Sequence, residues 1–143
     1  MTVGSAETRA IIENYVRAWK TNDRELLLSL FAEDASWEDP VGTPAFVGHE
    51  GVARFWEFAH VEDGRTLTPV PHKIMACGNE GVLHFTMQVR LPAANQGLDL
   101  VVIDQFILDE QGKIKSAKAY WDEQCVSCPE GMDLFVPNIG NSH

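Results

Sequence analysis

Residues 81–122, with the sequence GVLHFTMQVRLPAANQGLDLVVIDQFILDEQGKIKSAKAYWD, decide the fold class of this chain. Valine, isoleucine, leucine and phenylalanine recur there in runs typical of β-strands, and turns rich in Gly, Pro, Asn and Asp separate the runs. One further run precedes them, so the expected strands are residues 66–77, 81–91, 98–108 and 113–122. Connections this short join antiparallel neighbours, which predicts a four-stranded meander.

Upstream of the meander, the apolar residues recur at the spacing of helices. The first helix is expected from Ala6 to Lys20, and Asp23 is expected to cap a short second helix that ends near Ala32. A short strand follows at residues 35–39, and a third helix at residues 48–59. Three helices followed by a meander predict an α+β fold, with the helices packed on one face of a curved, mostly antiparallel sheet.

Composition and charge narrow the range of partners. The chain has 143 residues, 45% hydrophobic and 22% charged, which indicates one globular domain and argues against disorder. The net charge is −10, from 11 Lys and Arg against 21 Asp and Glu, and the basic residues form no stripe. Nucleic acid and anionic membrane surfaces are therefore not expected partners. No apolar stretch approaches the roughly 20 residues of a membrane-spanning helix.

The two ends of the chain bear on location and domain boundaries. The start, MTVGSAETRAIIENY, lacks the basic and apolar regions of a signal peptide, and three cysteines are an odd number, so we expect a cytoplasmic protein with reduced thiols. Residues 1–124 form the expected domain, and the polar residues 125–143 form a tail that either covers the sheet or stays mobile. The tail contains a CxxC at Cys125 and Cys128, but no second ligand pair accompanies it, so we expect no metal.

Asp104 breaks the pattern of its strand. On one face of residues 98–108 it interrupts an otherwise apolar row: Leu98, Leu100, Val102, Phe106 and Leu108. A carboxyl group buried in such a row escapes the cost of burial by keeping its proton, and it can then donate a hydrogen bond. The alternative is that this face is exposed, because the opposite face, with Val101, Ile103 and Ile107, is also apolar.

Two further polar residues stand out upstream. Tyr15 lies on the apolar stripe of the first helix, where a buried phenol needs a hydrogen-bond partner. Asp39 ends the first short strand beside Pro40, and it is either a turn former or an ionised carboxylate that moves a proton. A phenol and a protonated acid together make a two-donor site for a developing oxyanion.

These residues carry a resemblance to a known family. Tyr15 in IIENYVRAW, Asp39 in LFAEDASWEDPVG and Asp104 in VVIDQFILDEQGKI, followed by AYW, resemble the bacterial ketosteroid isomerases of the SnoaL-like, nuclear-transport-factor-2-like superfamily. The resemblance runs from about Glu7 to Glu123 and implies a cone-shaped α+β fold. It also implies isomerisation of a Δ5-3-ketosteroid to the Δ4 form. Asp39 would be the general base, with Tyr15 and a protonated Asp104 holding the dienolate oxygen.

The same resemblance implies a small hydrophobic, steroid-like substrate in an apolar cavity. The residues expected in its walls are Phe31, Phe55, Trp56, Phe85, Met87 and Trp121. Trp56 departs from the family, which often has a tyrosine there whose hydroxyl supports the catalytic phenol. The chain has neither a dinucleotide-binding loop nor a P-loop, so cofactor-free chemistry is expected.

Two other functions stay open. A dehydratase or cyclase of the same superfamily would use Asp39 with a pocket histidine, His72 or His84, on another hydrophobic carbonyl compound. A non-catalytic protein would use the same cavity to hold an apolar ligand. In each case the apolar residues on both faces of residues 98–108 and 113–122 favour a homodimer formed through the open face of the sheet.

Overall fold

A computed structural model describes residues 3–60 and 63–135 of the chain. Its helices are α1 (Ser5–Lys20), α2 (Arg24–Leu30) and α3 (Gly48–Ala59), with short 3-10 turns η1 (Pro92–Ala94) and η2 (Glu123–Cys125). Its strands are β1 (Phe31–Glu38), β2 (Phe46–Val47), β3 (Thr66–Cys77), β4 (Glu80–Leu91), β5 (Gln96–Leu108), β6 (Ile114–Tyr120), β7 (Val126–Ser127) and β8 (Asp133–Leu134). The predicted α+β class is confirmed.

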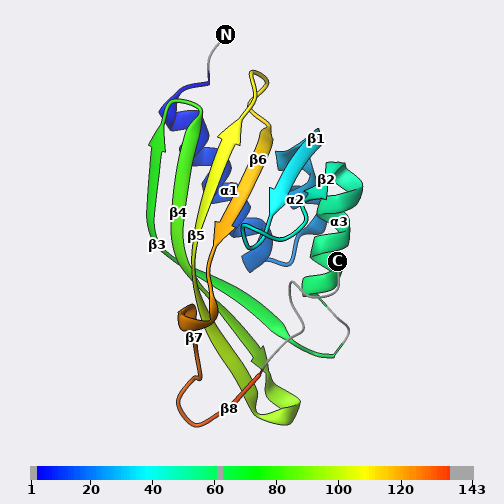
Figure 1. Cartoon of the computed structure of the whole chain (residues 1–143), viewed down its shortest axis with the longest axis vertical. Coiled ribbons are helices and arrows are strands. Elements are labelled where there is room, and N and C mark those ends of the chain that lie inside the picture. The colour runs from blue at the N-terminus through cyan, green and yellow to red at the C-terminus, as the bar shows by residue number, and fades with distance from the viewer. Residues whose placement is uncertain (1–2, 61–62, 136–143) are drawn as a thin grey trace.

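The strands form one curved sheet in the order β2-β1-β6-β5-β4-β3 (Figure 1). Strands β3 to β6 are the predicted antiparallel meander. Strand β1 joins the meander parallel to β6, so the sheet is mixed at this edge. In register, Asp104 pairs with Leu83 and Val102 pairs with Phe85, so inward residues of β4 and β5 stand side by side.

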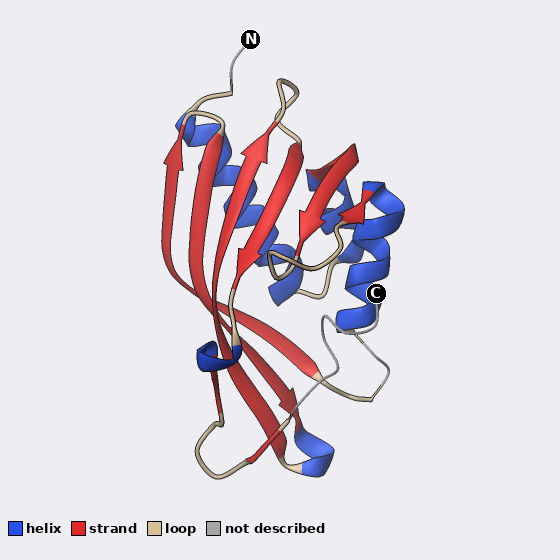
Figure 2. Ribbon diagram, in the orientation of Figure 1, coloured by secondary structure: helices blue, strands red, loops and turns tan. Residues whose placement is uncertain are grey.

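The helices lie together on one face of the sheet (Figure 2). Helix α1 packs on β3 and β4, and α3 packs on β1 and β2. Helix α1 comes so close to β4 that a Cβ atom added at Gly81 would lie 2.6 Å from the Ile12 side chain. The Thr8 hydroxyl also donates to the Gly78 carbonyl at 2.6 Å. These contacts fix α1, and with it Tyr15, against the sheet.

Helix α2 ends two residues earlier than expected. Asp23 caps its start as predicted, since its carboxylate accepts from the Leu26 N–H at 3.0 Å. The helix stops at Leu30 because Phe31 already has an extended backbone and pairs with Ile114 of β6. The Phe31 ring then stacks on Trp37 at 5.2 Å in the core. Burial of that ring therefore overrides the helical spacing of the sequence.

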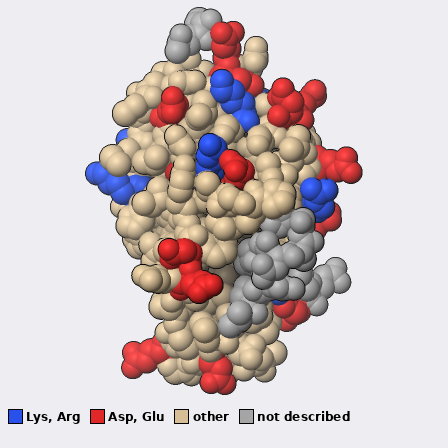
Figure 3. Space-filling model, in the orientation of Figure 1, with Lys and Arg blue, Asp and Glu red and all other residues tan. Residues whose placement is uncertain are grey.

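Beyond β6, the described part of the predicted tail lies along β5. Strand β7 pairs with β5 at Asp99, and β8 pairs with it at Gln96 and Gly97. No helix in the described residues is long and apolar enough to cross a membrane. On the face seen in Figure 3, the described Lys and Arg side chains are scattered and form no basic patch.

Candidate active site

A cavity lies between α1, α3 and the inner face of the sheet. It has about 670 Å³ of empty space, part of which opens to solvent. Its apolar walls come mainly from inward residues of β3 to β5: Leu67, Phe85, Met87, Val89, Leu98, Leu100 and Val102. The three residues that the sequence singled out, Tyr15, Asp39 and Asp104, all line this one cavity. The structure therefore brings together groups that lie far apart in the chain.

The face of β5 that carries Asp104 is the inner one. Asp104 is 4% exposed, whereas Val101 and Ile103 on the other face are 40% and 46% exposed. Among the described residues, nothing hydrogen-bonds to the Asp104 Oδ2 atom. Burial, and then the negative charge of Asp39, raise the pKa of Asp104 well above its usual value. Burial therefore favours the protonated form of Asp104, in which the carboxyl group can donate a hydrogen bond.

Tyr15 lies beside this acid. The residue is 4% exposed, and its ring packs edge-on against Phe106 at 4.8 Å. Burial raises the pKa of the Tyr15 phenol well above its usual value, and the nearby charges of Asp104 and Asp39 raise it further. The phenol therefore stays protonated across the pH range in which proteins are stable. Tyr15 and Asp104 both line the cavity, and hydrogen bonding from Tyr15 opposes part of the rise in the pKa of Asp104.

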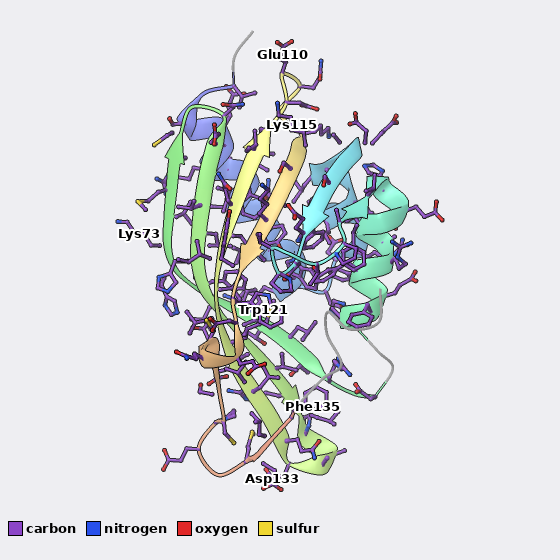
Figure 4. The ribbon with its side chains drawn as sticks, viewed as in Figure 1. Lys73, Glu110, Lys115, Trp121, Asp133 and Phe135 are labelled. Carbon is purple, nitrogen blue, oxygen red and sulfur yellow. The ribbon has the colours of Figure 1, made fainter. Side chains whose placement is uncertain are left out.

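Asp39 is the second carboxyl group that lines the cavity. It directly follows β1 and is only partly exposed. The Trp121 Nε1–H donates to its Oδ1 atom at 2.8 Å, from just beyond the end of β6 (Figure 4). Burial raises the pKa of Asp39 to about 6, while hydrogen bonds from the Trp121 and Trp37 indoles lower it. Asp39 is thus ionised at neutral pH and able to accept a proton.

The sequence of this chain is similar to those of known proteins. The family model for the SnoaL-like domain matches residues 12–117. The chain belongs to the SnoaL-like family. One relative of this SnoaL-like chain is a steroid Δ-isomerase of Nocardioides simplex, 26% identical over 117 residues that cover 82% of the chain and 91% of the relative.

Solved structures show that this SnoaL-like fold has been used for other chemistry. One is the epoxide hydrolase/cyclase-like enzyme SalBIII, which acts in pyran ring formation in salinomycin. It has a TM-score of 0.75 and 21% identity, and the match covers 87% of this chain and 97% of SalBIII. Another is an LEH-like epoxide hydrolase of M. tuberculosis, with a TM-score of 0.72, 18% identity and coverage of 85% and 86%. At these identities the likeness shows a shared fold.

Of the six wall residues expected in the SnoaL-like chain, four line the cavity: Phe55, Phe85, Met87 and Trp121. The other two lie outside its described lining. Phe31 is 1% exposed and packs in the core on Trp37. Trp56 packs against Trp19 with ring centroids 4.6 Å apart, so it supports a cavity residue instead of forming the wall itself.

Several lining residues were not picked out from the sequence. Trp19 follows Tyr15 by one helical turn, and this spacing, which puts both residues on one face of the helix, could have identified it as a cavity residue. Leu98 and Leu100 belong to the Asp104 row, so the alternation along β5 already implied them. No sequence pattern pointed to Arg65 as a cavity residue, because its position depends on tertiary contacts. It makes an ion pair with Asp63 at 2.8 Å, and its guanidinium lies 4.9 Å from the ring of Phe135, which Figure 4 labels.

The two candidate histidines of this SnoaL-like domain, His72 and His84, lie on the neighbouring strands β3 and β4. His72 and His84 pair with each other at 4.9 Å, and His72 contacts the Thr86 hydroxyl at 2.7 Å. Neither belongs to the described lining of the cavity. Within residues 3–60 and 63–135, no group of three His, Cys, Asp or Glu side chains is placed to hold a metal ion.

Proposed function

We propose that this SnoaL-like protein is a cofactor-independent isomerase that moves the double bond of a 3-ketosteroid from Δ5 to Δ4. The observation that carries the proposal is a pair of carboxyl groups in one apolar cavity whose environments affect their pKa values to different extents. The pKa of Asp39 is raised to about 6, whereas that of Asp104 is raised well above its usual value, so we infer that Asp39 is ionised and Asp104 protonated at neutral pH. A proton-transfer enzyme needs one base and one acid at the same pH, and this pair supplies both. The likeness to a steroid Δ-isomerase agrees with it.

The base step uses the geometry around Asp39. Its carboxylate takes a proton from the carbon between the ketone and the double bond, and the electron pair of that C–H bond moves through the π-system to the carbonyl oxygen. The Trp121 N–H donates to Oδ1 at 2.8 Å, which orients the carboxylate for this proton transfer. Asp39 then returns the same proton two carbons further along, which shifts the double bond with no net loss of atoms.

The intermediate dienolate carries its negative charge on oxygen. Tyr15 and Asp104 both line the cavity, and in the proposed mechanism their O–H groups donate to that oxygen. Donors aimed at a developing charge in a dry site stabilise it more than they stabilise the neutral ketone, which lowers the barrier. Because Asp104 is neutral, it adds a donor without adding a charge that would repel the dienolate.

The shape of the wall suits a long, flat, apolar molecule. The inward residues of β5 run from Asp104 to Leu98, and at about 3.3 Å per residue this row extends for about 20 Å. Apart from Asp104 the row is apolar, and Phe85, Met87 and Val89 of β4 lie beside it. A fused polycyclic substrate with its ketone at Asp104 would lie along this row. A Δ5-3-ketosteroid, followed by the ultraviolet absorbance of the conjugated product, is therefore the substrate to test.

The pH dependence of kcat/KM is expected to report Asp39. The base works only when ionised, so activity should rise with pH and level off above an apparent pKa of about 6. Below that pH, activity should fall about tenfold per pH unit as Asp39 gains a proton. The assay is the initial rate of enone formation from about pH 4.5 to 9, with circular dichroism at each pH to confirm folding. A flat profile across pH 5 to 7 would contradict Asp39 as the base.

A second candidate is ring opening or closure of an epoxide, in keeping with the SnoaL-like epoxide hydrolase and cyclase folds. The observation that favours it is the same acid and base pair, because a neutral Asp104 could protonate an epoxide oxygen while Asp39 deprotonates the attacking hydroxyl. A dehydratase or cyclase that depends on His72 or His84 has no such support, since neither residue belongs to the described lining. A protein that only holds an apolar ligand would bind the steroid product and form no enone at any pH.

We also propose that the protein is a homodimer through the outer face of β5 and β6. Ile103 and Tyr120 pair across these strands and are 46% and 47% exposed, and Val101 beside them is 40% exposed. Exposed apolar residues grouped on an open sheet face are typical of an interface. Sedimentation at micromolar concentration should give a dimer, and Ile103→Lys should shift it to a monomer. A wild-type monomer at that concentration would contradict the proposal.

A further inference from the structure

The indole N–H of Trp19 is a buried donor that lacks a well-formed hydrogen bond. Trp19 is 4% exposed, and its Nε1 atom makes no hydrogen bond of good geometry within the described residues. An indole N–H can only donate, so burial away from water costs free energy until it finds an acceptor. Such orphaned donors are uncommon in folded proteins, and this one lines the cavity that holds Tyr15 and Asp104.

The ring of Trp19 is held in one orientation. It stacks on His60 at 5.4 Å with an interplanar angle of 10°, and the Trp56 ring packs against it at 4.6 Å, tilted by 34°. The rings of Trp37 and Phe55 meet it edge-on at 6.3 and 6.1 Å. A ring packed on several sides cannot turn its N–H toward solvent, so the direction of this donor is set by packing.

The acceptor beside this donor is the oxygen of Tyr15. The two residues are four apart on α1 and therefore lie on one face of the helix, with their rings 6.3 Å apart. Trp19 acts on the phenol as a hydrogen-bond donor that lowers the pKa of Tyr15, although no bond of good geometry joins the two side chains. Catalytic hydrogen bonds often tighten only when the reacting complex forms.

We propose that Trp19 is a positioning residue that supports Tyr15, donating its indole N–H to the Tyr15 oxygen while the Tyr15 hydroxyl donates to the substrate oxygen. As negative charge develops on that substrate oxygen, the phenol shares its proton and its own oxygen becomes a better acceptor. The Trp19 hydrogen bond then strengthens, and the two bonds polarise each other. Trp19 thus favours the charged intermediate more than the neutral ketone. The inference rests on the proposed role of Tyr15 as an oxyanion donor.

Trp56 provides a matched control. It belongs to the same aromatic stack, 4.1 Å from His60 and 4.6 Å from Trp19, but it lies outside the described lining of the cavity. Trp19→Phe and Trp56→Phe each replace one indole of this aromatic cluster with a smaller phenyl ring, so both weaken its packing. The Trp19 variant alone removes an N–H beside Tyr15. A difference between the two variants in ligand affinity or turnover therefore measures the effect of the Trp19 hydrogen bond.

The first measurement is binding of 4-nitrophenol, which is an anion at pH 8 and places a phenolate oxygen where a dienolate oxygen would lie. It is made in the Asp39→Asn background, which removes the carboxylate that would repel the anion. Adding Trp19→Phe should weaken 4-nitrophenolate binding about fivefold to tenfold and leave binding of the neutral Δ4-3-ketosteroid within twofold. Adding Trp56→Phe should leave the affinities for 4-nitrophenolate and for the neutral ketosteroid within twofold. Equal effects of the two variants on the phenolate, or no effect of Trp19→Phe, would overturn the inference.

The second measurement is turnover of the Δ5-3-ketosteroid with Asp39 intact. Trp19→Phe should lower kcat about tenfold with little change in KM, which is less than the 10²- to 10³-fold expected for a donor that touches the oxyanion. An unchanged kcat would overturn the inference. If the wild type forms no enone, the proposed isomerase function fails, and the phenolate measurement still decides whether Trp19 supports Tyr15.

Discussion

Asp39→Asn is expected to lower kcat for enone formation by about three to four orders of magnitude. The amide has the shape of the carboxylate but cannot accept a proton from carbon, so the first step loses its base. The Trp121 N–H can still donate to the amide oxygen in place of Oδ1, so the side chain should keep its orientation. Binding of the steroid product should therefore stay within about threefold of wild type. Initial rates by ultraviolet absorbance and product titration by fluorescence give the two numbers.

The same variant is expected to be more stable than wild type at pH 8. Burial raises the pKa of Asp39 from 3.8 to about 6, so the folded state holds its proton more tightly than the unfolded chain does. Stability therefore falls as pH rises between about 4 and 6, by up to about 3 kcal/mol at 1.36 kcal/mol per pKa unit. An uncharged amide at this position avoids this loss of folding stability. Thermal unfolding at pH 8 should show a higher Tm for Asp39→Asn.

Glu38→Gln is the control for the loss of turnover and the higher Tm expected of Asp39→Asn. Glu38 is the preceding residue, and its carboxylate lies 3.8 Å from the Lys118 amine, with its side chain 28% exposed. Removal of a partly exposed charge of this kind should change turnover and Tm little. Wild-type turnover in Asp39→Asn would rule out Asp39 as the base, and an unchanged Tm at pH 8 would mean that its carboxylate is better hydrated than its burial indicates.

The second large effect is expected at Asp104, where two substitutions give different results. Asp104→Asn keeps the shape and supplies an N–H donor, so kcat should fall by about tenfold or less. Asp104→Leu keeps a similar size but has no donor, and kcat should fall about 10²- to 10³-fold, as is typical when one oxyanion donor is removed. The comparison tests whether Asp104 acts as a neutral donor, because an amide can replace a protonated carboxyl and cannot replace a carboxylate.

Stability separates this effect from simple misfolding. Asp104 is buried in an apolar row, and its Oδ2 atom has no partner among the described residues, so Asp104→Leu should fold at least as stably as wild type. A variant that is stable, binds the steroid product and turns over slowly would locate the loss in the transition state. If Asp104→Asn is as slow as Asp104→Leu, the carboxyl acts in its ionised form and the donor role is wrong.

Much of the fold could be predicted from local patterns. The bounds of α3 and β3 match the sequence prediction, because helical spacing and strand composition act over a few residues. The end of α2 was misplaced, since Phe31 leaves the helix to bury its ring against Trp37. The parallel pairing of β1 with β6 and the short strands β7 and β8 were not predicted, because they depend on contacts between distant segments.

The sequence by itself determined the three-helix and meander pattern, the apolar row that Asp104 interrupts, and the likeness of its motifs to a family. Only the tertiary structure decided which face of β5 is buried, because both faces are apolar and only the packing of helices on one side distinguishes them. It also decided that the Trp121 N–H donates to Asp39. This contact depends on the arrangement of β1 and β6 in the curved sheet, which brings residues 82 positions apart within hydrogen-bond distance and which no local pattern encodes.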